Sequence, residues 1–282
     1  MRAFSSEEAK EVAALAAVEM VREGEVLAIG SGSTVDKAIR ALGHRFSDSV
    51  RKPAVVAASR QSESLVREVG LPLLSLSEVT TFPLMLDGAD EVAHDLTLIK
   101  GGGGALTREK LLATMSQKLI IMADYTKLVE RTGEKSLLPV EVIPFAAPFV
   151  GRELHRLKLE PTLRLRPGSG SLQPFLTDNQ CHILDCRLPE SPGDLAELDA
   201  KIKSLRGVVE SGLFVRMASI VYVGTREGRV EELRPAEERQ PSTIPPELKS
   251  ALIEKIHSKT VNSTSAPRSG SRESRFRRKA AK

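Results

Sequence analysis

The segment GSGST at residues 30–34 has the residue types of an anion-binding loop. It follows a short apolar run, residues 26–29, and precedes a helical stretch, so backbone N–H groups, a helix dipole and hydroxyls would converge at one point, which most often binds a phosphate. The segment is no dinucleotide fingerprint, because Val35 replaces the third glycine, and no P-loop, because no GK[ST] follows. A plain tight turn capped by Ser33 or Thr34 is the alternative.

Two acids, Asp87 and Asp90, frame the segment DGAD, which follows another apolar run. This order places both carboxylates in a loop at the carboxyl end of a strand, where open α/β sheets bind their ligands. Two acids three residues apart can divide proton transfer between them or contact sugar hydroxyls. An Asx-turn with a solvated acid is the alternative.

The segment KGGGG at residues 100–104 joins a positive charge to four glycines. Consecutive glycines give a ligand close access to the backbone, and their place directly after two apolar residues argues against a flexible connector. Glu109 lies near the start of the next helix, for which Thr107 is the expected cap, and it could be an ordinary first-turn acid. Lys127 has the same ambiguity, because lysines on turns are usually solvated.

The histidines and cysteines indicate no metal site. The five histidines form neither H-x-H nor H-E-x-x-H, and the two cysteines lack ligand spacing. The sequence also has no G-x-S-x-G elbow. Metal-dependent and serine-nucleophile chemistry are therefore not expected.

The elements that must position these residues alternate between strands and helices. A capping box of Ser5 and Glu8 opens an amphipathic helix that ends at Gly24. Apolar runs typical of strands buried on both faces then alternate with further helices, the first of which ends at Gly43. The pattern predicts an α/β fold with a mostly parallel sheet and helices on both faces. The expected strands are 26–29, 54–58, LPLLSL, PLMLDG and 119–124, and the expected helices are 35–42, 62–68 and 107–117.

After about residue 144 the pattern changes. TLRLR (162–166), QPFLTD and HILDC alternate apolar with polar residues, which predicts antiparallel strands with one solvated face. A helix at 195–205 and VVESGLF follow, and SIVYVG (219–224) is apolar enough to rejoin the first sheet. The predicted organisation is an α/β catalytic domain of residues 1–145 and 215–235, a smaller α+β lid domain of residues 146–214, and a basic tail of residues 240–282.

The length of 282 residues and the 41% apolar content allow about two domains with a sizeable core. The net charge of +4 belongs to the tail, because residues 240–282 hold ten Lys and Arg against three acids, +7, which leaves −3 for the rest. From about residue 258 we expect disorder, since apolar periodicity is absent. The run RFRRK could contact RNA weakly or serve as a nuclear address, although a solvated basic end is the simpler interpretation and nucleic-acid binding is not expected.

No apolar run reaches the ~18 residues that a membrane-spanning helix needs, and the start MRAFSSEEAK is too polar for a signal or transit peptide. If Cys181 and Cys186 share a strand, they point to opposite faces about 16 Å apart, beyond disulfide reach. A cytoplasmic protein is therefore expected, rather than a stapled secreted one.

In their order, the segments GSGST, DGADEV, LIKGGGGALTREK, ADYTK and LPVEVIP resemble the type A ribose-5-phosphate isomerase family, and the likeness extends over roughly residues 7–228. The resemblance implies a Rossmann-like sheet with an inserted, ferredoxin-like α+β lid. It implies an aldose–ketose isomerase that interconverts D-ribose 5-phosphate and D-ribulose 5-phosphate in the pentose phosphate pathway. No metal or nucleotide cofactor and a homodimer or homotetramer are also implied.

The resemblance assigns roles to residues of this chain. It places the general base on Glu109, which would move a proton between C2 and C1 while Asp87 and Lys100 manage charge and protons on the two oxygens of a cis-enediolate. The substrate-binding residues that it implies are those of the phosphate loop, two added lysines and the two segments lining the sugar: Lys10, Ser31, Gly32, Ser33, Thr34, Asp87, Gly88, Ala89, Asp90, Lys100, Gly101, Gly102, Gly103 and Lys127.

Some positions depart from the family pattern. Ser31 replaces a threonine and keeps its hydroxyl, TDNGN has become TDNQC with Gln180 and Cys181, and a family Ala-Asp reads Ala218-Ser219. We expect these changes to affect lid and sheet packing rather than the reaction. Two other functions stay open: a sugar-phosphate sensor, although no helix-turn-helix precedes the first strand, and a CoA transferase-like enzyme with a covalent glutamyl intermediate.

Overall fold

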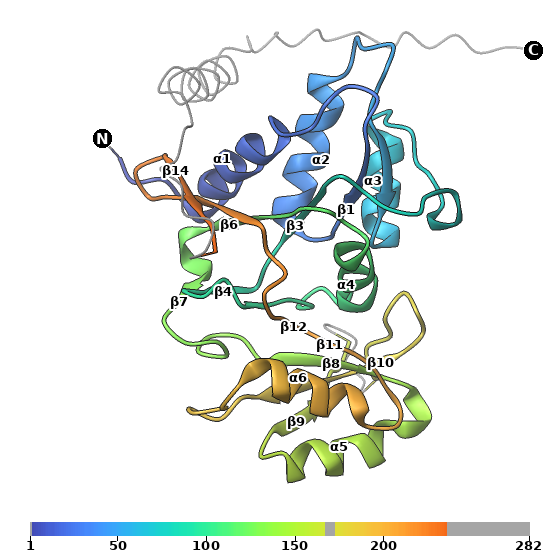
Figure 1. The fold of residues 1–282 in the computed structure, drawn as a ribbon, viewed down its shortest axis with the longest axis vertical. Helices are drawn as coiled ribbons and strands as arrows, with labels where there is room; N and C mark the ends of the chain where they lie inside the picture. The colour runs from blue at the N-terminus through green and yellow to red at the C-terminus, as the bar shows by residue number, and fades with distance from the viewer. Residues whose placement is uncertain (1, 167–172, 236–282) are drawn as a thin grey trace, which may run out of the picture. The chain divides into compact units, whose positions relative to one another are not determined.

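The computed structural model describes residues 2–166 and 173–235, and a six-stranded sheet is its central feature in this range (Figure 1). In the order in which they lie side by side, its strands are β14 (Val230–Leu233), β13 (Ile220–Gly224), β6 (Leu119–Asp124), β3 (Met85–Gly88), β1 (Val26–Ile29) and β2 (Ala54–Ala57). All neighbours pair in parallel except β13 and β14. The expected mostly parallel sheet is confirmed, and residues 220–224 return to it beside β6.

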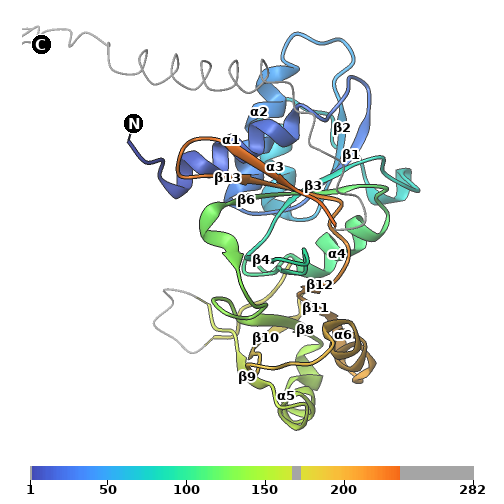
Figure 2. The same ribbon diagram turned by 60° about the vertical axis from the view of Figure 1, so that its left-hand side comes forward.

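Helices cover both faces of this sheet, as Figures 1 and 2 show. On one face, α1 (Ser6–Val18) packs on β6 and β13 and α2 (Ser33–Arg45) packs on β3, while on the other α4 (Leu106–Thr114) contacts β1 and β3. The remaining helix of this part, α3 (Arg60–Glu68), packs on α2 and β2. Strands covered on two sides must be apolar throughout, which is why β1 and β6 are buried along nearly their whole length.

One helix start was predicted correctly and two helix ends wrongly, since α1 was expected to end at Gly24 and ends at Val18. The capping box of Ser5 and Glu8 is present at the start of α1. The helix α2, however, continues through Gly43 to Arg45. A Cβ at Gly43 would lie 2.6 Å from the Cβ of Val69, so the glycine allows α2 and the end of α3 to approach closely and does not terminate the helix.

Two apolar segments expected to be strands do not form them. LPLLSL touches β2 only through an isolated bridge at Leu73 and leads into a 3-10 turn, η1 (Leu76–Glu78). QPFLTD pairs only through an isolated bridge at Pro174. Each segment contains a proline, which has no N–H to give to a ladder of hydrogen bonds.

A second sheet among the described residues has four antiparallel strands in the order β11-β8-β10-β9. Two helices pack on its strands, and α4 contacts β8 and β11. The order along the chain is strand, helix, strand, strand, helix, strand, which is the expected ferredoxin-like pattern. The elements are β8 (Leu138–Val142), α5 (Ala147–Arg156), β9 (Glu160–Leu163), β10 (His182–Arg187), α6 (Leu195–Ser204) and β11 (Val208–Ser211).

This sheet takes its first strand from before residue 146, where the smaller domain was expected to begin. The strand β8 starts at Leu138, and its register with β10 runs from Leu138 to Val142. The described residues all belong to one closely packed unit, 1–243. The division into two domains at residues 145 and 215 stays a prediction.

A third sheet, which the sequence did not predict, consists of short strands in the described residues. Figure 2 shows β4 and β12 of this third sheet between the six-stranded sheet and the antiparallel sheet that contains β8 and β11, hereafter called the four-stranded sheet. Its order is β12 (Leu213–Phe214), β5 (Leu98–Ile99), β4 (Glu91–Ala93) and β7 (Leu128–Val129). This small sheet carries the chain from DGAD through KGGGG.

The two cysteines are free thiols, with Cys181 just before β10 and Cys186 within it. Among residues 2–166 and 173–235, no helix is long and apolar enough to cross a membrane. The basic tail and the disorder expected from about residue 258 lie outside the described residues.

Candidate active site

Three charged side chains meet beneath the carboxyl end of the central strands. Asp87 lies in β3, Lys100 directly follows β5, and Glu109 lies in the first turn of α4. The Lys100 Nζ is 2.9 Å from Asp87 Oδ2 and 3.0 Å from Glu109 Oε2, and it donates a hydrogen bond of 2.8 Å to the Gly88 carbonyl. The structure thus brings together the three residues predicted to act on protons and charge.

All three side chains are buried, which changes their proton affinities. Burial raises the pKa of Glu109 to about 8, the charge of Asp87 adds to the rise and Lys100 opposes it. Burial likewise raises the pKa of Asp87. Burial disfavours charge on Lys100, but the two neighbouring acids outweigh it and raise its pKa above the ordinary value. A carboxyl group that titrates near neutral pH beside a permanent cation suits a general base for proton transfer.

The backbone holds Asp87 against the loop GSGST. The N–H groups of Gly88 and Ser31 donate to Asp87 Oδ1 at 2.7 and 3.4 Å. A Cβ at Gly30 would collide with the Asp87 carboxylate, so glycine is required where the loop passes the acid. The phosphate-loop candidate and the charged trio are therefore one contiguous site.

The loop itself has the geometry of an uncapped helix start. Gly32 occupies the N-cap of α2 with a φ of +115°, and no side chain caps the helix there. The alternative of a turn capped by Ser33 or Thr34 is therefore wrong. Lys10 of α1 donates to Ser33 Oγ at 3.2 Å and pairs with Glu7 at 2.6 Å. Free helix N–H groups beside a lysine and hydroxyls form a suitable environment for a phosphate.

DGAD and KGGGG are joined by hydrogen bonds. The Gly102 N–H donates to Asp90 Oδ2 at 2.7 Å, and Gly101 adopts a φ of +103° that favours glycine. Gly88, Ala89 and Asp90 are half-buried. Together with the exposed residues Gly102 and Gly103, they give a ligand access to the backbone beside Lys100.

Lys127 is connected to the loop of residues 30–34 indirectly, through α1. It ends the 3-10 turn η2 (Tyr125–Lys127), which packs against α1, the helix that carries Lys10. The side chain is half-buried and makes no hydrogen bond or ion pair with the described residues. Its role toward a phosphate stays a prediction.

Thr107 was expected to cap α4, but it does not. The N-cap is Ala105, without a side-chain hydrogen bond, and the Thr107 hydroxyl donates instead to the buried carboxylate of Glu141 in β8. Thr177 Oγ1 and Asn179 Nδ2 donate to the same carboxylate at 2.6 and 3.2 Å. The only sequence signal was an acid within the apolar segment LPVEVIP.

Two more residues at the site were missed. The guanidinium of Arg164 donates to the carbonyls of Gly101 and Gly102 at 2.9 and 3.0 Å and pairs with Asp185. The ring of Phe214, which is fully buried, has its centroid 5.3 Å from Lys100 Nζ. Neither position carries a local motif, because both reach the site through strand pairing with distant parts of the chain.

Of the departures from the family pattern, Ser31 contacts the trio through its N–H, which donates to Asp87 Oδ1, whereas Gln180 and Ser219 make no hydrogen bond to the three side chains among the described residues. Ser219 exchanges hydrogen bonds with Leu119 at the start of β6. Gln180 adopts a φ of +60°, a conformation that glycine reaches more easily. The expectation that the departures affect packing rather than the reaction stays a prediction.

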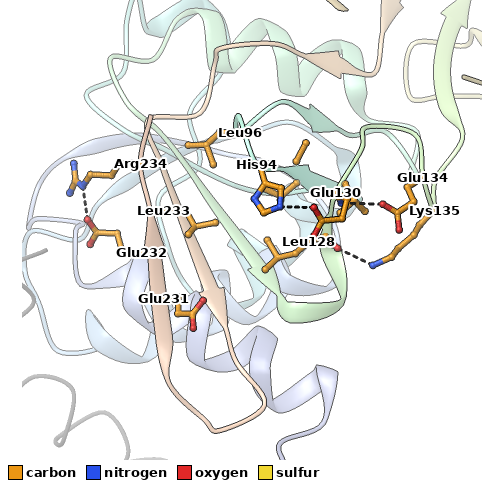
Figure 3. Close-up of a pocket in the computed structure, with 13 residues that line it drawn as sticks. His94, Leu96, Leu128, Glu130, Glu134, Lys135, Glu231, Glu232, Leu233 and Arg234 are labelled. Carbon is orange, nitrogen blue, oxygen red and sulfur yellow. Dashed lines mark hydrogen bonds and ion pairs between the residues drawn. The ribbon is translucent and has the colours of Figure 1, made fainter. Parts of the chain in front are cut away.

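A groove of about 710 Å³ lies between β4, β7 and β14 and contains none of the predicted site residues. Figure 3 shows Leu96, Leu128 and Leu233 in it, with His94 paired to Glu130 at 3.0 Å. Within residues 2–166 and 173–235, no group of three or more His, Cys, Asp or Glu side chains is placed to hold a metal ion. The cluster of charges, rather than concavity, marks the candidate site.

Comparisons with known proteins identify the family of this chain. The family model of ribose 5-phosphate isomerase A (phosphoriboisomerase A) matches residues 54–228. The ribose-5-phosphate isomerase A of Gloeobacter violaceus is 46% identical over 228 residues, which cover 80% of this chain and 96% of the relative. The structure of ribose 5-phosphate isomerase A from Methanocaldococcus jannaschii superposes with a TM-score of 0.76 at 37% identity, covering 82% of this chain and 100% of that one.

A D-ribose-5-phosphate isomerase solved in complex with phospho-erythronic acid superposes equally well, with a TM-score of 0.78, 35% identity and coverage of 82% and 100%. The matched range includes DGAD, KGGGG, Glu109 and Lys127. The relatives extend the match to most of the described residues. The resemblance read from the motifs is confirmed, and the chain belongs to the ribose 5-phosphate isomerase A family.

Proposed function

We propose that this aldose–ketose isomerase interconverts D-ribose 5-phosphate and D-ribulose 5-phosphate with Glu109 as the base that carries the proton. The observation that supports the role is the trio itself, a buried carboxyl with a pKa raised to about 8 and 3.0 Å from a lysine. In its ionised form Glu109 can accept a proton from the substrate.

The reaction runs through a cis-enediolate. Glu109 takes the proton from C2 of the open-chain aldose, and the electron pair of the C–H bond forms the C1–C2 double bond while negative charge develops on O1. Lys100, a fixed cation, stabilises that charge, and Asp87 serves as the proton relay between O2 and O1. Glu109 then returns its proton to C1, which completes the ketose. Carbon oxidation states exchange within the substrate, so no redox cofactor is needed.

The phosphate group of the substrate binds at the start of α2. The backbone of residues 31–34, the Ser33 and Thr34 hydroxyls, Lys10 and Lys127 supply donors and positive charge. Residues 87–90 and 100–103 line the sugar. One similar structure is a complex with phospho-erythronic acid, a phosphorylated ligand, which supports a phosphate site in this fold.

The enzyme works without a metal ion and as a homodimer or homotetramer in the cytoplasm. The metal-free mechanism is supported by Lys100, which occupies the place between two acids where a cation would act. Two exposed apolar side chains, Phe145 just before α5 and Phe149 within it, support an interface between two copies of the chain. Light scattering of the purified protein measures the oligomeric state.

The decisive experiment measures ribulose 5-phosphate formation from ribose 5-phosphate in the presence and absence of a chelator. We expect equal rates in both, and exchange of the C2 proton with solvent deuterium. Loss of activity with chelator contradicts the metal-free mechanism. An absence of isomerisation together with CoA transfer and a glutamyl adduct would favour the transferase alternative.

A further inference from the structure

The helix that carries Glu109 begins without a cap. Its N-cap residue, Ala105, makes no side-chain hydrogen bond, and α4 spans only Leu106–Thr114. Helix starts that lack a side-chain acceptor are less stable than capped ones. Some other contact must therefore fix the first turn, because a base has to be held at one position relative to the reacting carbon.

The contacts come from the four-stranded sheet. Thr107 donates to Glu141 of β8, which is fully buried. Lys110 pairs with Glu210 of β11 at 3.1 Å, and Glu210 lies opposite Glu141 in the register of the two strands. Two neighbouring carboxylates of one sheet thus hold residues on both sides of Glu109.

The Glu141 site is specific in its chemistry. Its three donors, Thr107, Thr177 and Asn179, are all neutral groups, and two of them belong to the loop after β9. Burying a carboxylate on neutral donors is costly compared with an apolar residue of the same volume. Its value lies in fixing geometry, because an acceptor-only group forces all three donors to point at one place.

We propose that Glu141 is a positioning residue for the isomerase: through Thr107 it fixes the first turn of α4 and holds the Glu109 carboxylate against Lys100. This inference rests on the proposed role of Glu109. The residue does not touch the reacting atoms. Because Glu141 lies in β8, its contact with Thr107 fixes the helix that carries Glu109 to the four-stranded sheet.

The test compares three single variants. Thr107→Val removes the hydroxyl that reaches Glu141 at nearly constant shape, Thr107→Ser keeps it, and Thr114→Val removes a hydroxyl from the last turn of the same helix, where it bonds only to Lys110 O. We expect Thr107→Val to lower kcat about tenfold or more with KM changed by less than about twofold, because misplacement of the base affects the transition state and not ground-state binding. Thr107→Ser should restore kcat, and Thr114→Val should match the wild type.

A double-variant cycle with Glu141→Gln makes the test independent of general destabilisation. If Glu141 acts through Thr107, the double variant loses no more kcat than the worse single variant, whereas additive losses overturn the proposal. If Glu141→Gln does not fold, the Thr107 pair decides alone. If the wild type isomerises ribose 5-phosphate and Thr107→Val has the same kcat as Thr114→Val, the positioning role is refuted. If the wild type itself does not isomerise ribose 5-phosphate, the proposed function is refuted instead.

Discussion

Two charge clusters share the ring of Phe214, and they differ in how many lysines pair with one carboxyl group. Lys100 Nζ lies 5.3 Å from the ring centroid and Lys110 Nζ lies 5.0 Å from it. Around Lys100, two acids face one cation. Lys110 and Lys203 both pair with Glu210, and a second acid, Asp199, lies 3.6 Å from Lys110.

The two arrangements shift the pKa values of their carboxyl groups in opposite directions. Burial raises the pKa of Glu109 to about 8, helped by Asp87. Burial also disfavours charge on Glu210, but Lys110 and Lys203 outweigh it and lower its pKa below the ordinary value. Burial alone therefore does not make a base. Both carboxyl groups are buried, so the difference lies in their neighbours: Glu109 shares one lysine with a second acid, whereas two lysines pair with Glu210.

The largest effect is expected from Glu109→Gln. The change keeps size and hydrogen bonding but removes basicity, so kcat should fall by ~10²–10⁴ while the substrate still binds. Exchange of the substrate C2 proton with deuterium, followed by NMR, should stop. Turnover within about tenfold of the wild type would transfer the role to another acid, and Asp87 would be the next candidate.

Lys100→Met tests how far the cluster of Asp87, Lys100 and Glu109 depends on its single cation, and the free energy of unfolding is the measurement. Removing the cation leaves Asp87 and Glu109 buried without compensation, which should cost about 3–5 kcal/mol of unfolding free energy at neutral pH, measured by urea denaturation. The loss should shrink at pH 5, because both acids can then be protonated. A loss that is the same at pH 5 and pH 8 would show that the acids do not repel each other.

The pH dependence of stability should separate the two clusters. The folded-state pKa of Glu109 is raised to about 8 from an ordinary 4.5, so its contribution to stability is present below 4.5 and is lost as the pH rises through 8. Between pH 5 and 9, the wild type should lose at least ~1.4 kcal/mol relative to Glu109→Gln.

Glu210 should behave in the opposite way. Its folded-state pKa is lowered, so its contribution is present above 4.5 and is lost as the pH falls below that value. The advantage of the wild type over Glu210→Gln should therefore disappear in the acid range. Parallel pH profiles for the two variants would contradict the comparison.

A lysine without an acid partner should give the smallest effect. Lys127 forms no ion pair with the described residues, so Lys127→Ala leaves no buried acid unpaired and should not lower stability measurably. We expect KM for ribose 5-phosphate to rise about tenfold with little change in kcat, because phosphate binding is shared by ground and transition states. The matched control is Lys201→Ala on the exposed side of α6, which should leave KM unchanged.

Much of the six-stranded sheet could be predicted because its strands are apolar on both faces. The runs at β1 and β6 have no polar residue in their interiors. The glycine loop after β1 could be predicted because it separates an apolar strand run from a stretch with helical periodicity. The charged trio could be proposed because Asp87, Lys100 and Glu109 lie in the motifs that carry the family resemblance, which assigned their roles.

The rest could not be predicted, because it depends on contacts between distant residues. The third sheet is made of strands of two or three residues, too short for any periodicity. Gly43 has the residue type of a helix end, and only the packing of Val69 explains why the helix continues. Phe214 reaches the site from the returning chain and Glu141 from the strand β8, and an acid within an apolar segment was the only local signal for Glu141.

The pairing of β6 with β13 has a consequence for how the protein folds. Ile120 lies opposite Ile220, and the whole four-stranded sheet is formed by the chain between them. The Lys100 N–H also donates to the Gly212 carbonyl at 3.0 Å, so the returning chain completes the site. Closing so long a loop costs entropy before its contacts compensate, which slows folding. Secondary structure should therefore recover first on refolding and during synthesis, and catalytic activity should appear only after residues beyond 212 have docked.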